Sequence, residues 1–442
     1  MELKPYLEYK DTGVDWLPII PKEWKILPNR SIFTERIKKN NNSSEELLSV
    51  TIKEGVIPQK DFLSNSSKKD SSNEDKSNYK LVKEGDLAYN KMRMWQGAIG
   101  ASKYQGIVSP AYIVLKPRNG INSWYYHFLF RTPMYTKESR RFSYGICDDQ
   151  LSLRYYDFKL MTSPIPSPNE QKFIIDFINT KTNQISKYIE LKQSLINLLE
   201  EQKKAIINQA ITRGLGHNAK LKPSGLKWLG NIPRHWNLVK IAHLTTKITN
   251  GYVGPTRDIM REYGVPYIQG IHIKNNSIVF TPNGPYYVSK QWSNEHSKSI
   301  LKKDDVLVVQ TGSIGEVGIV SEESDGANCH ALIILRMNPK LGIGKYLLYT
   351  LSSRFGYDSL FFIKTGDILF HLNCTKIRNV FLPNPPVNEQ KEIVEYIEKT
   401  IKPIKNTIKQ IQYINNICLE YQTKLISDVV TGKICVGGKN AN

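Results

Sequence analysis

Residues 167–178 have the sequence SPNEQKFIIDFI and open a run of about forty residues without proline or glycine, which closes as ITRG at 211–214. A proline at the first helical position, a carboxylate at the third and a closing glycine are start and stop signals of a helix. The run therefore predicts one long helix over residues 166–214, roughly 60 Å long at about 1.5 Å per residue.

The same plan returns 219 positions later, as PVNEQKEIVEYI at 386–397 and VVTG at 429–432. A 4,3 spacing marks corresponding positions of the two copies: Ile178, Thr182, Ile185, Ile189, Lys192, Ile196, Leu199, Lys203, Ile206 and Ala210, and Ile397, Ile401, Ile404, Ile408, Ile411, Asn415, Cys418, Gln422, Leu425 and Val429. This common heptad register predicts that helices 166–214 and 383–433 pair as a spacer. Two unrelated amphipathic helices, each packed on its own domain, are the alternative. Pro403 removes a helix hydrogen bond, so the second helix is expected to begin as two pieces.

A second repeat precedes each globular segment. GVDWL at 13–17 and IPKEW at 20–24 return 212 positions later as GLKWL at 225–229 and IPRHW at 232–236. Such internal repetition predicts two copies of one structural unit. We therefore expect a lead segment, a domain and a long helix, then a second set of the same and a short tail: 1–24, 25–165, 166–214, 215–236, 237–382, 383–433 and 434–442.

Composition favours a polyanionic partner. Lys and Arg number 61 against 41 acidic residues, which gives a net charge of +20 and a pI near 9.4. Nucleic acid is the expected partner and a membrane surface the alternative. The chain has neither a long apolar run nor the apolar core of a signal peptide, so we expect it in the cytoplasm. Its five scattered cysteines suggest neither a disulfide framework nor a zinc site.

The first domain is expected to be rich in strands. LLSVTI at 47–52, DLAYNKM at 86–92 and GIVSPAYIVLK at 106–116 have strand-like composition. Two polar tracts, KKNNNSSEE at 38–46 and SNSSKKDSSNEDKSN at 64–78, are too poor in apolar residues to pack and predict mobile surface loops.

Cations and amides alternate with aromatic and apolar residues between 83 and 100. Arg and Lys suit guanine edges and phosphates, and Asn and Gln can pair with adenine. The candidate DNA contacts of this domain are Asn90, Lys91, Arg93, Trp95, Gln96, Tyr144 and Arg154. The alternative is a strand whose alternate positions are solvated, with Trp95 in the core.

The second domain has a comparable layout, with VPYIQGIHI at 265–273, DDVLVVQTGSIGEVGIV at 304–320 and HALIILRM at 330–337. Gly315 and Gly318 fall 218 positions after Gly97 and Gly100, but the flanking residues differ. Matching frames with different loops suit two modules that read different sequences. The candidate DNA contacts here are Gln269, His272, Gln310, Thr311, Ser313, Lys364 and His371.

Motifs for catalysis are incomplete. NPPV at 384–387 has Val where an amino-methyltransferase has an aromatic residue, and no glycine-rich cofactor motif precedes it. GSIGEVG at 312–318 is better explained as a turn, and GIGK at 342–345 lacks the first glycine of a phosphate loop. His371 and Cys374 have one ligand-like spacing without a second pair. We therefore expect no catalytic or metal site, and any catalysis to belong to a partner.

The duplicated G-x-x-W-L and IP-x-x-W segments, the NEQ helix openings and the TRG and TGK endings resemble the specificity subunit of type I restriction-modification enzymes over nearly the whole chain. The resemblance implies an α+β fold with two globular, strand-rich target recognition domains. Two long antiparallel coiled-coil helices would separate them, with a pseudo-two-fold internal repeat. Each domain would read one half of a split, asymmetric double-stranded DNA site, with half-site centres about 10 base pairs apart.

The resemblance also implies partners. The helices would dock two methyltransferase subunits, which use S-adenosylmethionine to methylate adenine, and separate restriction subunits would use ATP and magnesium to translocate and cut DNA. This chain itself would bind no cofactor and would not be an enzyme. The alternatives are a non-catalytic basic coiled-coil scaffold for nucleic acid and a degenerate DNA methyltransferase.

Overall fold

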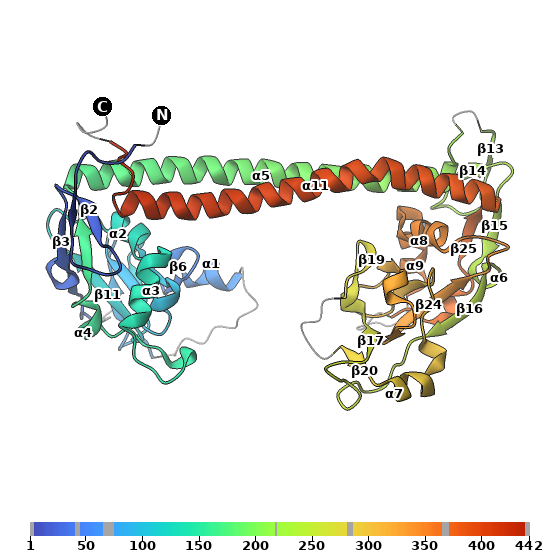
Figure 1. The fold of residues 1–442 in the computed structure, drawn as a ribbon, viewed down its shortest axis with the longest axis horizontal. Coiled ribbons are helices and arrows are strands. Elements are labelled where there is room, and N and C mark those ends of the chain that lie inside the picture. Colours follow the sequence, from blue (N-terminus) through green and yellow to red (C-terminus); the bar gives the residue numbers. More distant parts are fainter. Residues whose placement is uncertain are drawn as a thin grey trace. The chain divides into compact units, whose positions relative to one another are not determined.

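The computed structural model describes residues 4–39, 45–64, 75–216, 219–280, 286–364 and 371–437 (Figure 1). The chain forms two compact units, the first made of Met1–Lys192 and Tyr413–Asn442 and the second of Gln193–Gln412. Each unit therefore contains one globular domain and one end of each long helix. Most of the two polar tracts, at 40–44 and 65–74, lies outside the described residues, so their predicted mobility stays a prediction.

Both predicted long helices are present, α5 (Pro168–Arg213) and α11 (Val387–Val430). The Ser167 hydroxyl accepts a hydrogen bond from the Glu170 backbone N–H at 3.3 Å, and Gly214 ends α5 with φ +70°. The prediction that the second helix begins as two pieces is wrong, because α11 runs without a break through Pro403. Proline removes one backbone donor and crowds the preceding turn, but Ile401 in that turn is 2% exposed and belongs to the core of the second unit.

Within each unit α5 and α11 lie side by side and run antiparallel (Figure 1). In the second unit Ile196 packs with Ile408 and Ile411. Further along α5, its later residues share a core with earlier residues of α11: Ile207, Ala210 and Ile211 with Ile393, Val394 and Ile397. In the first unit Ile174 and Ile178 share a core with Leu425 and Val429. The predicted pairing of the two helices is therefore confirmed in both units.

A four-stranded antiparallel sheet forms the centre of the first unit. Its order is β4-β11-β8-β9, with strands Phe33–Glu35, Tyr112–Pro117, Leu87–Asn90 and Ile99–Ala101. Helices α2 (Ser123–Leu129) and α3 (Pro133–Arg141) follow β11. The core is aromatic, with Trp24, Phe33, Tyr89, Tyr125, Tyr126, Phe130, Tyr135 and Phe158 fully buried. Smaller two-stranded pairings are β5-β6 (Leu48–Thr51, Gly55–Pro58) and β7-β10 (Lys80–Val82, Gly106–Val108).

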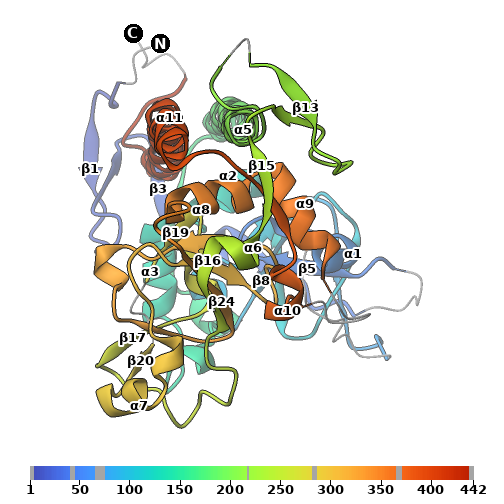
Figure 2. The ribbon, with the colours of Figure 1, turned by 90° about the vertical axis from the view of Figure 1, so that its right-hand side faces the viewer.

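The second unit repeats this plan and extends it. Its sheet order is β16-β24-β21-β22-β19-β18, with strands Thr245–Asn250, Leu332–Met337, Val306–Val309, Val317–Ile319, Asn276–Ile278 and Ile273–Lys274. Helices α8 (Gly344–Ser352) and α9 (Arg354–Phe362) follow β24, as α2 and α3 follow β11. Side chains of α8 share one core with β21 and α11, and Figure 2 shows α8 beneath α11. The internal repeat inferred from sequence is thus a repeat of strand and helix order.

Corresponding strand pairs close the two domains. In the first, β3 (Lys25–Pro28) pairs antiparallel with β12 (Thr162–Ile165). In the second, β15 (Asn237–Lys240) pairs antiparallel with β25 (Phe381–Asn384). The strand that follows each lead segment therefore lies beside the strand that precedes each long helix.

The repeated tryptophan of each lead segment receives the end of a long helix. Trp24 and Trp236 are both fully buried. A Cβ on Gly214, at the end of α5, would stand 3.1 Å from Trp236 Cζ2. A Cβ on Gly432, just after α11, would stand 3.1 Å from Trp24 Cζ3 and would overlap Pro21. The glycine at the end of each long helix therefore contacts a proline and a tryptophan of the lead segment in the other repeat.

The NEQ motif fastens the start of each long helix. Gln171 Oε1 accepts from the Asn122 N–H at 2.8 Å, and Gln390 Oε1 accepts from the Ile343 N–H at 3.2 Å. Both amides are fully buried. The neighbouring carboxylates bind aromatic groups near the lead segments, Glu170 through the Tyr6 hydroxyl at 2.6 Å and Glu389 through the Trp236 indole N–H at 2.9 Å. The motif joins helix, domain and lead segment.

Each domain has a buried aspartate at the equivalent position. The arginine that pairs with it comes from a different segment in each domain. Asp86 binds Arg36, which follows β4, at 2.6 and 2.9 Å. Asp305, 219 positions after Asp86, binds Arg336 of β24 at 2.7 Å through both oxygens. Both are two-point pairs, which are among the stronger hydrogen-bonded contacts.

Gly432→Ala tests the contact between helix end and indole. The new Cβ would crowd Pro21 and Trp24 in backbone at φ +76°, so we expect the free energy of unfolding of the first unit to fall by roughly 2–4 kcal/mol. Hydrogen exchange of the backbone amides around Trp24, in the full chain, measures the change. Gly225→Ala is the matched control, because Gly225 has φ +80° with nothing within 4 Å of an added Cβ, and should cost about 1 kcal/mol. Equal losses at both positions would contradict the packing role.

Candidate nucleic-acid interface

The turn between β8 and β9 carries five of the predicted residues of the first unit. Met94, fully buried, anchors it, and Gly97 completes it with φ +85°. The backbone leaves the sheet after Asn90, and apart from Met94 the side chains of the turn keep some exposure: Lys91, Trp95 and Gln96 are half-buried and Arg93 is exposed. The alternative, a strand with Trp95 in the core, does not fit this turn.

Trp95 is part of a small cluster that the sequence did not reveal. The guanidinium carbon of Arg140, near the end of α3, lies 5.3 Å from the centroid of the Trp95 ring. Arg140 Nη2 also donates to Asp148 Oδ1 at 2.7 Å. We name Trp95, Arg140 and Asp148 the arginine cluster. The basic end of α3 was the only signal for Arg140, and it gave no reason to prefer this residue over Arg141.

A loop at 143–154 brings the two remaining candidates of this unit to the same turn. Tyr144 and Ser152 exchange two backbone hydrogen bonds, at 3.1 and 2.8 Å. The Leu153 N–H donates to the Lys91 carbonyl at 2.8 Å, which ties the loop to the turn. Tyr144 is 74% exposed, and Arg154 is exposed at the start of α4 (Tyr155–Phe158). All seven predicted residues of the first domain therefore lie on two connected segments.

In the second unit the equivalent turn joins β21 to β22. Thr311 and Ser313 are exposed on it, and Gly312 and Gly315 have positive φ, so the predicted turn is present, although Val317 and Gly318 already belong to β22. His371 is exposed next to Leu372, whose N–H donates to the Gln310 carbonyl at 3.1 Å. The turn and the segment at 371–374 are thus neighbours.

Gln310 and His272 lie largely inside the second unit. Gln310, 8% exposed, donates through Nε2 to Asn250 Oδ1 at 3.1 Å and to the Leu372 carbonyl at 3.2 Å. His272, 1% exposed, accepts from the Gln269 N–H at 2.9 Å. Burial, and then the cation of Lys274, lower the pKa of His272 and favour its neutral form. Both residues support the neighbouring backbone and offer little surface to a ligand.

The other two candidates of the second unit lie at the margins of the same turn. Gln269 is half-buried, and a Cβ on its neighbour Gly270 would stand 3.3 Å from Val309, the last residue of β21. Lys364 is half-buried just after α9, with its ammonium 3.4 Å from the centroid of the Phe361 ring. The residues selected from the sequence therefore lie around one turn, but the sequence did not separate exposed residues from supporting ones.

Both turns rest on the second helix after β11 or β24 in the same way. A Cβ on Gly97 would stand 3.5 Å from Thr136 of α3, and a Cβ on Gly315 would stand 3.6 Å from Tyr357 of α9. One helical turn later the residues differ in kind: Arg140 in the first unit, and Phe361, stacked on Tyr357 at 6.1 Å, in the second. The two units therefore share the contact between turn and helix, but the side chains beside the turn differ between them.

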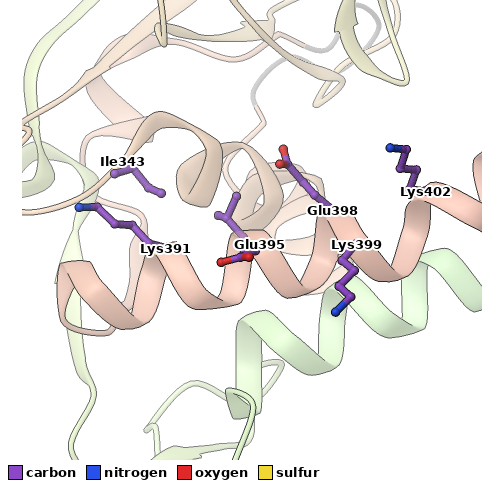
Figure 3. A pocket seen from close by; sticks show the side chains of 7 residues that line it. Ile343, Lys391, Glu395, Glu398, Lys399 and Lys402 are labelled. Atoms are coloured by element: carbon purple, nitrogen blue, oxygen red, sulfur yellow. The ribbon is translucent and has the colours of Figure 1, made fainter.

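A shallow hollow of about 570 Å³ lies along the first turns of α11 in the second unit (Figure 3). Its lining mixes cations, carboxylates and apolar side chains: Ile343, Lys391, Val394, Glu395, Glu398, Lys399 and Lys402. Lys345 Nζ binds Glu398 Oε1 at 2.8 Å. Mixed charge is a poor match for a polyanion, so the hollow differs in character from the turn of the first unit.

In the structure the NPPV tract at 384–387 lies where β25 leads into α11. The Asn384 side chain accepts from Gln390 Nε2 at 3.0 Å, so the NPPV tract holds the start of α11. Across the part of the chain that the structure describes, no three His, Cys, Asp or Glu side chains gather as metal ligands. Among the helices of those same residues, none combines the length and the apolar character that crossing a bilayer requires.

Gln310→Ala tests the supporting role of this amide. The substitution leaves the Leu372 carbonyl without its side-chain donor, at a cost of about 1–3 kcal/mol in local stability. We expect faster hydrogen exchange of the Leu372 amide. Thr311→Ala, at the exposed neighbouring position, should leave that exchange rate unchanged. An unaffected Leu372 amide in the Gln310 variant would exclude the role.

Residues 233–416 match the family described as the type I restriction modification DNA specificity domain. The chain is 26% identical over 255 residues to the type I restriction enzyme EcoBI specificity subunit of Escherichia coli, which covers 56% of this chain and 53% of that one. It is 23% identical over 377 residues to the putative type I restriction enzyme MjaX specificity subunit of Methanocaldococcus jannaschii, covering 82% and 81%.

The fold agrees with these matches. At 14% identity the chain superposes with a TM-score of 0.68 on a chain from a solved structure concerning complex assembly and conformational transition of the type I R-M system, covering 93% of this chain and 98% of that one. The strand order described above recurs in both halves, as the resemblance implied. In sequence the chain is therefore similar to type I restriction-modification specificity subunits, and its second half matches their DNA specificity domain.

Proposed function

We propose that this chain is the sequence-specific DNA-binding subunit of a type I restriction-modification complex. Each globular domain reads one half of a bipartite, asymmetric DNA site. The observation that carries the proposal is the pair of equivalent turns, each seated on the same helix, with different exposed side chains. A common frame with two different surfaces is what two half-sites of different sequence require.

The charge and chemistry of the first turn support a DNA partner. The chain carries a net charge of +20, and counterion release makes such a charge favourable for binding a polyphosphate. Lys91 and Arg93 can bind phosphates or guanine, and Gln96 can pair with adenine. A non-specific basic scaffold would need the charge but not two different turns on one frame, so it is the second candidate.

The partners follow from the family. Two methyltransferase subunits dock on the long helices and use S-adenosylmethionine, and restriction subunits use ATP and magnesium. This chain contributes no catalytic group and works in the cytoplasm. Exposed apolar side chains on the helices, such as Leu198 at 62% and Tyr413 at 67% exposure, favour docking, because a partner that packs on them removes their apolar surface from water. The mixed charges of the hollow in Figure 3 suit a protein surface.

The decisive experiment is co-expression with the cognate methyltransferase, followed by mapping of every methylated adenine in the host genome. A split, asymmetric motif with a fixed gap is the expected result. A soluble complex that binds DNA with salt dependence but without sequence preference would favour the non-specific scaffold. S-adenosylmethionine binding by the isolated chain would instead favour a degenerate methyltransferase.

Replacing residues 25–165 with the corresponding domain of a related subunit should change one half-site and leave the other. The reason is that each domain has its own sheet and its own core. The methylation map of the hybrid complex measures both half-sites at once. A simultaneous change in both halves would contradict one domain per half-site.

Lys91→Ala and Arg93→Ala should weaken DNA binding by the assembled complex, because both cations lie on the turn of the first unit. A phosphate contact would lower the salt slope by about one and spare specificity, whereas a base contact would relax one position by about 1–3 kcal/mol. Titrations of duplex DNA at several salt concentrations distinguish the two. Lys116→Ala is the control, since Lys116 is an exposed cation at the opposite end of β11. If all three variants bound DNA with the same affinity, the turn would not be part of the DNA interface.

A further inference from the structure

We infer that Arg140 reads a guanine in the half-site bound by the first domain, and that Trp95 and Asp148 are positioning residues for it. The inference rests on the proposed function and deepens it, because it assigns one base to one side chain. Arg140 lies outside every position that sequence reasoning selected.

Two separate segments hold the Arg140 guanidinium. Trp95, from the turn between β8 and β9, stands beneath it with 5.3 Å between ring centroid and guanidinium carbon. Asp148, from the loop at 143–154, accepts from Nη2 at 2.7 Å. The Trp95 ring is itself fixed, since its N–H donates to the Met92 carbonyl at 3.2 Å. An arginine on a surface helix normally has many rotamers, and these contacts reduce the entropy that would be lost on binding.

The held guanidinium still has free donors. Arginine carries five N–H groups in one plane, and Asp148 uses one of them. The Arg140 side chain remains 53% exposed. Guanine presents O6 and N7 as adjacent acceptors in the major groove, and a bidentate guanidinium is the side chain that matches them best. The geometry of the cluster therefore suits a guanine edge.

The carboxylate beside the guanidinium argues against a phosphate contact. Asp148 is 58% exposed and bears a negative charge on the same face as Arg140. A phosphate placed there would meet that charge, whereas the neutral edge of a base pair would not. Asp148 can in addition accept from the cytosine N4 amino group. The pair therefore selects a base edge over the DNA backbone.

The next residue, Arg141, has different partners from Arg140. Arg141, equally exposed, turns the other way and binds Glu138 of the same helix at 2.7 Å. Asp15 lies 3.7 Å from its other terminal nitrogen. Of these two consecutive arginines, only Arg140 faces the turn. In the second unit the helix that supports the turn carries Phe361 one turn after Tyr357, so this guanine reader belongs to one half-site.

The test uses the assembled complex with three conservative variants: Arg140→Lys, Asp148→Asn and Arg141→Lys. Arg140→Lys keeps the charge but loses the two-pronged donor, so one G·C position of the first half-site should lose its preference roughly tenfold or more. Asp148→Asn should weaken preference at the same position by less. Arg141→Lys should leave the methylation motif unchanged, as should the second half-site in all three variants. Unchanged thermal midpoints check that each variant is folded.

A base analogue gives an independent readout. A duplex with 7-deazaguanine at the assigned position lacks the N7 acceptor, so it should weaken binding by the wild-type complex and have little further effect on the Arg140→Lys complex. A uniform loss of binding at all positions, or an unchanged motif in the Arg140 variant, would overturn the inference while the bipartite site of the wild type stands. A wild-type complex without any bipartite motif would overturn the proposed function and this inference together.

Discussion

The contact between a helix-ending glycine and a buried indole is the constraint on which both units depend. A Cβ at Gly214 or Gly432 would stand 3.1 Å from the ring of Trp236 or Trp24, which is tighter than an ordinary contact. Around each contact the strand after the lead segment pairs with the strand before the next long helix. Each unit is therefore completed by a helix that began in the other repeat. The two spans of the first unit, at the beginning and end of the chain, are a direct consequence.

The sequence predicted the architecture well because its signals are local or repeated. The glycine and proline boundaries gave both long helices, and the common heptad register gave their pairing. The exception was Pro403, where the expected break does not occur: the helix continues through the proline, and the preceding turn is buried at Ile401. The roles of Gln171 and Gln390 could not be foreseen, since their partners are backbone groups 49 and 47 positions away, respectively.

The candidate DNA contacts selected from the sequence lie around two equivalent turns, but their exposure was not predicted. Residue type pointed to the turns after β8 and β21, and both turns are where strands leave the sheet. Whether a side chain faces solvent depends on neighbours distant in sequence, as for Gln310 beside Leu372 and His272 beside Tyr286. Arg140 was missed for the same reason: its partners Trp95 and Asp148 come from two other segments. Chemistry that depends on tertiary contact leaves little trace in one sequence.

A chain made of two similar halves faces the hazard that strands pair with the wrong sheet during folding. The buried carboxylates described above discriminate against this error. Asp86 pairs with Arg36, which follows β4, whereas Asp305 pairs with Arg336 of β24, the counterpart of β11. If β24 entered the first sheet in place of β11, Asp86 would face two guanidinium groups and Asp305 none. A buried carboxylate without its partner costs about 3–5 kcal/mol. Because the two equivalent aspartates take their arginines from different segments, the ion pairs favour the pairing of each strand with the sheet of its own half.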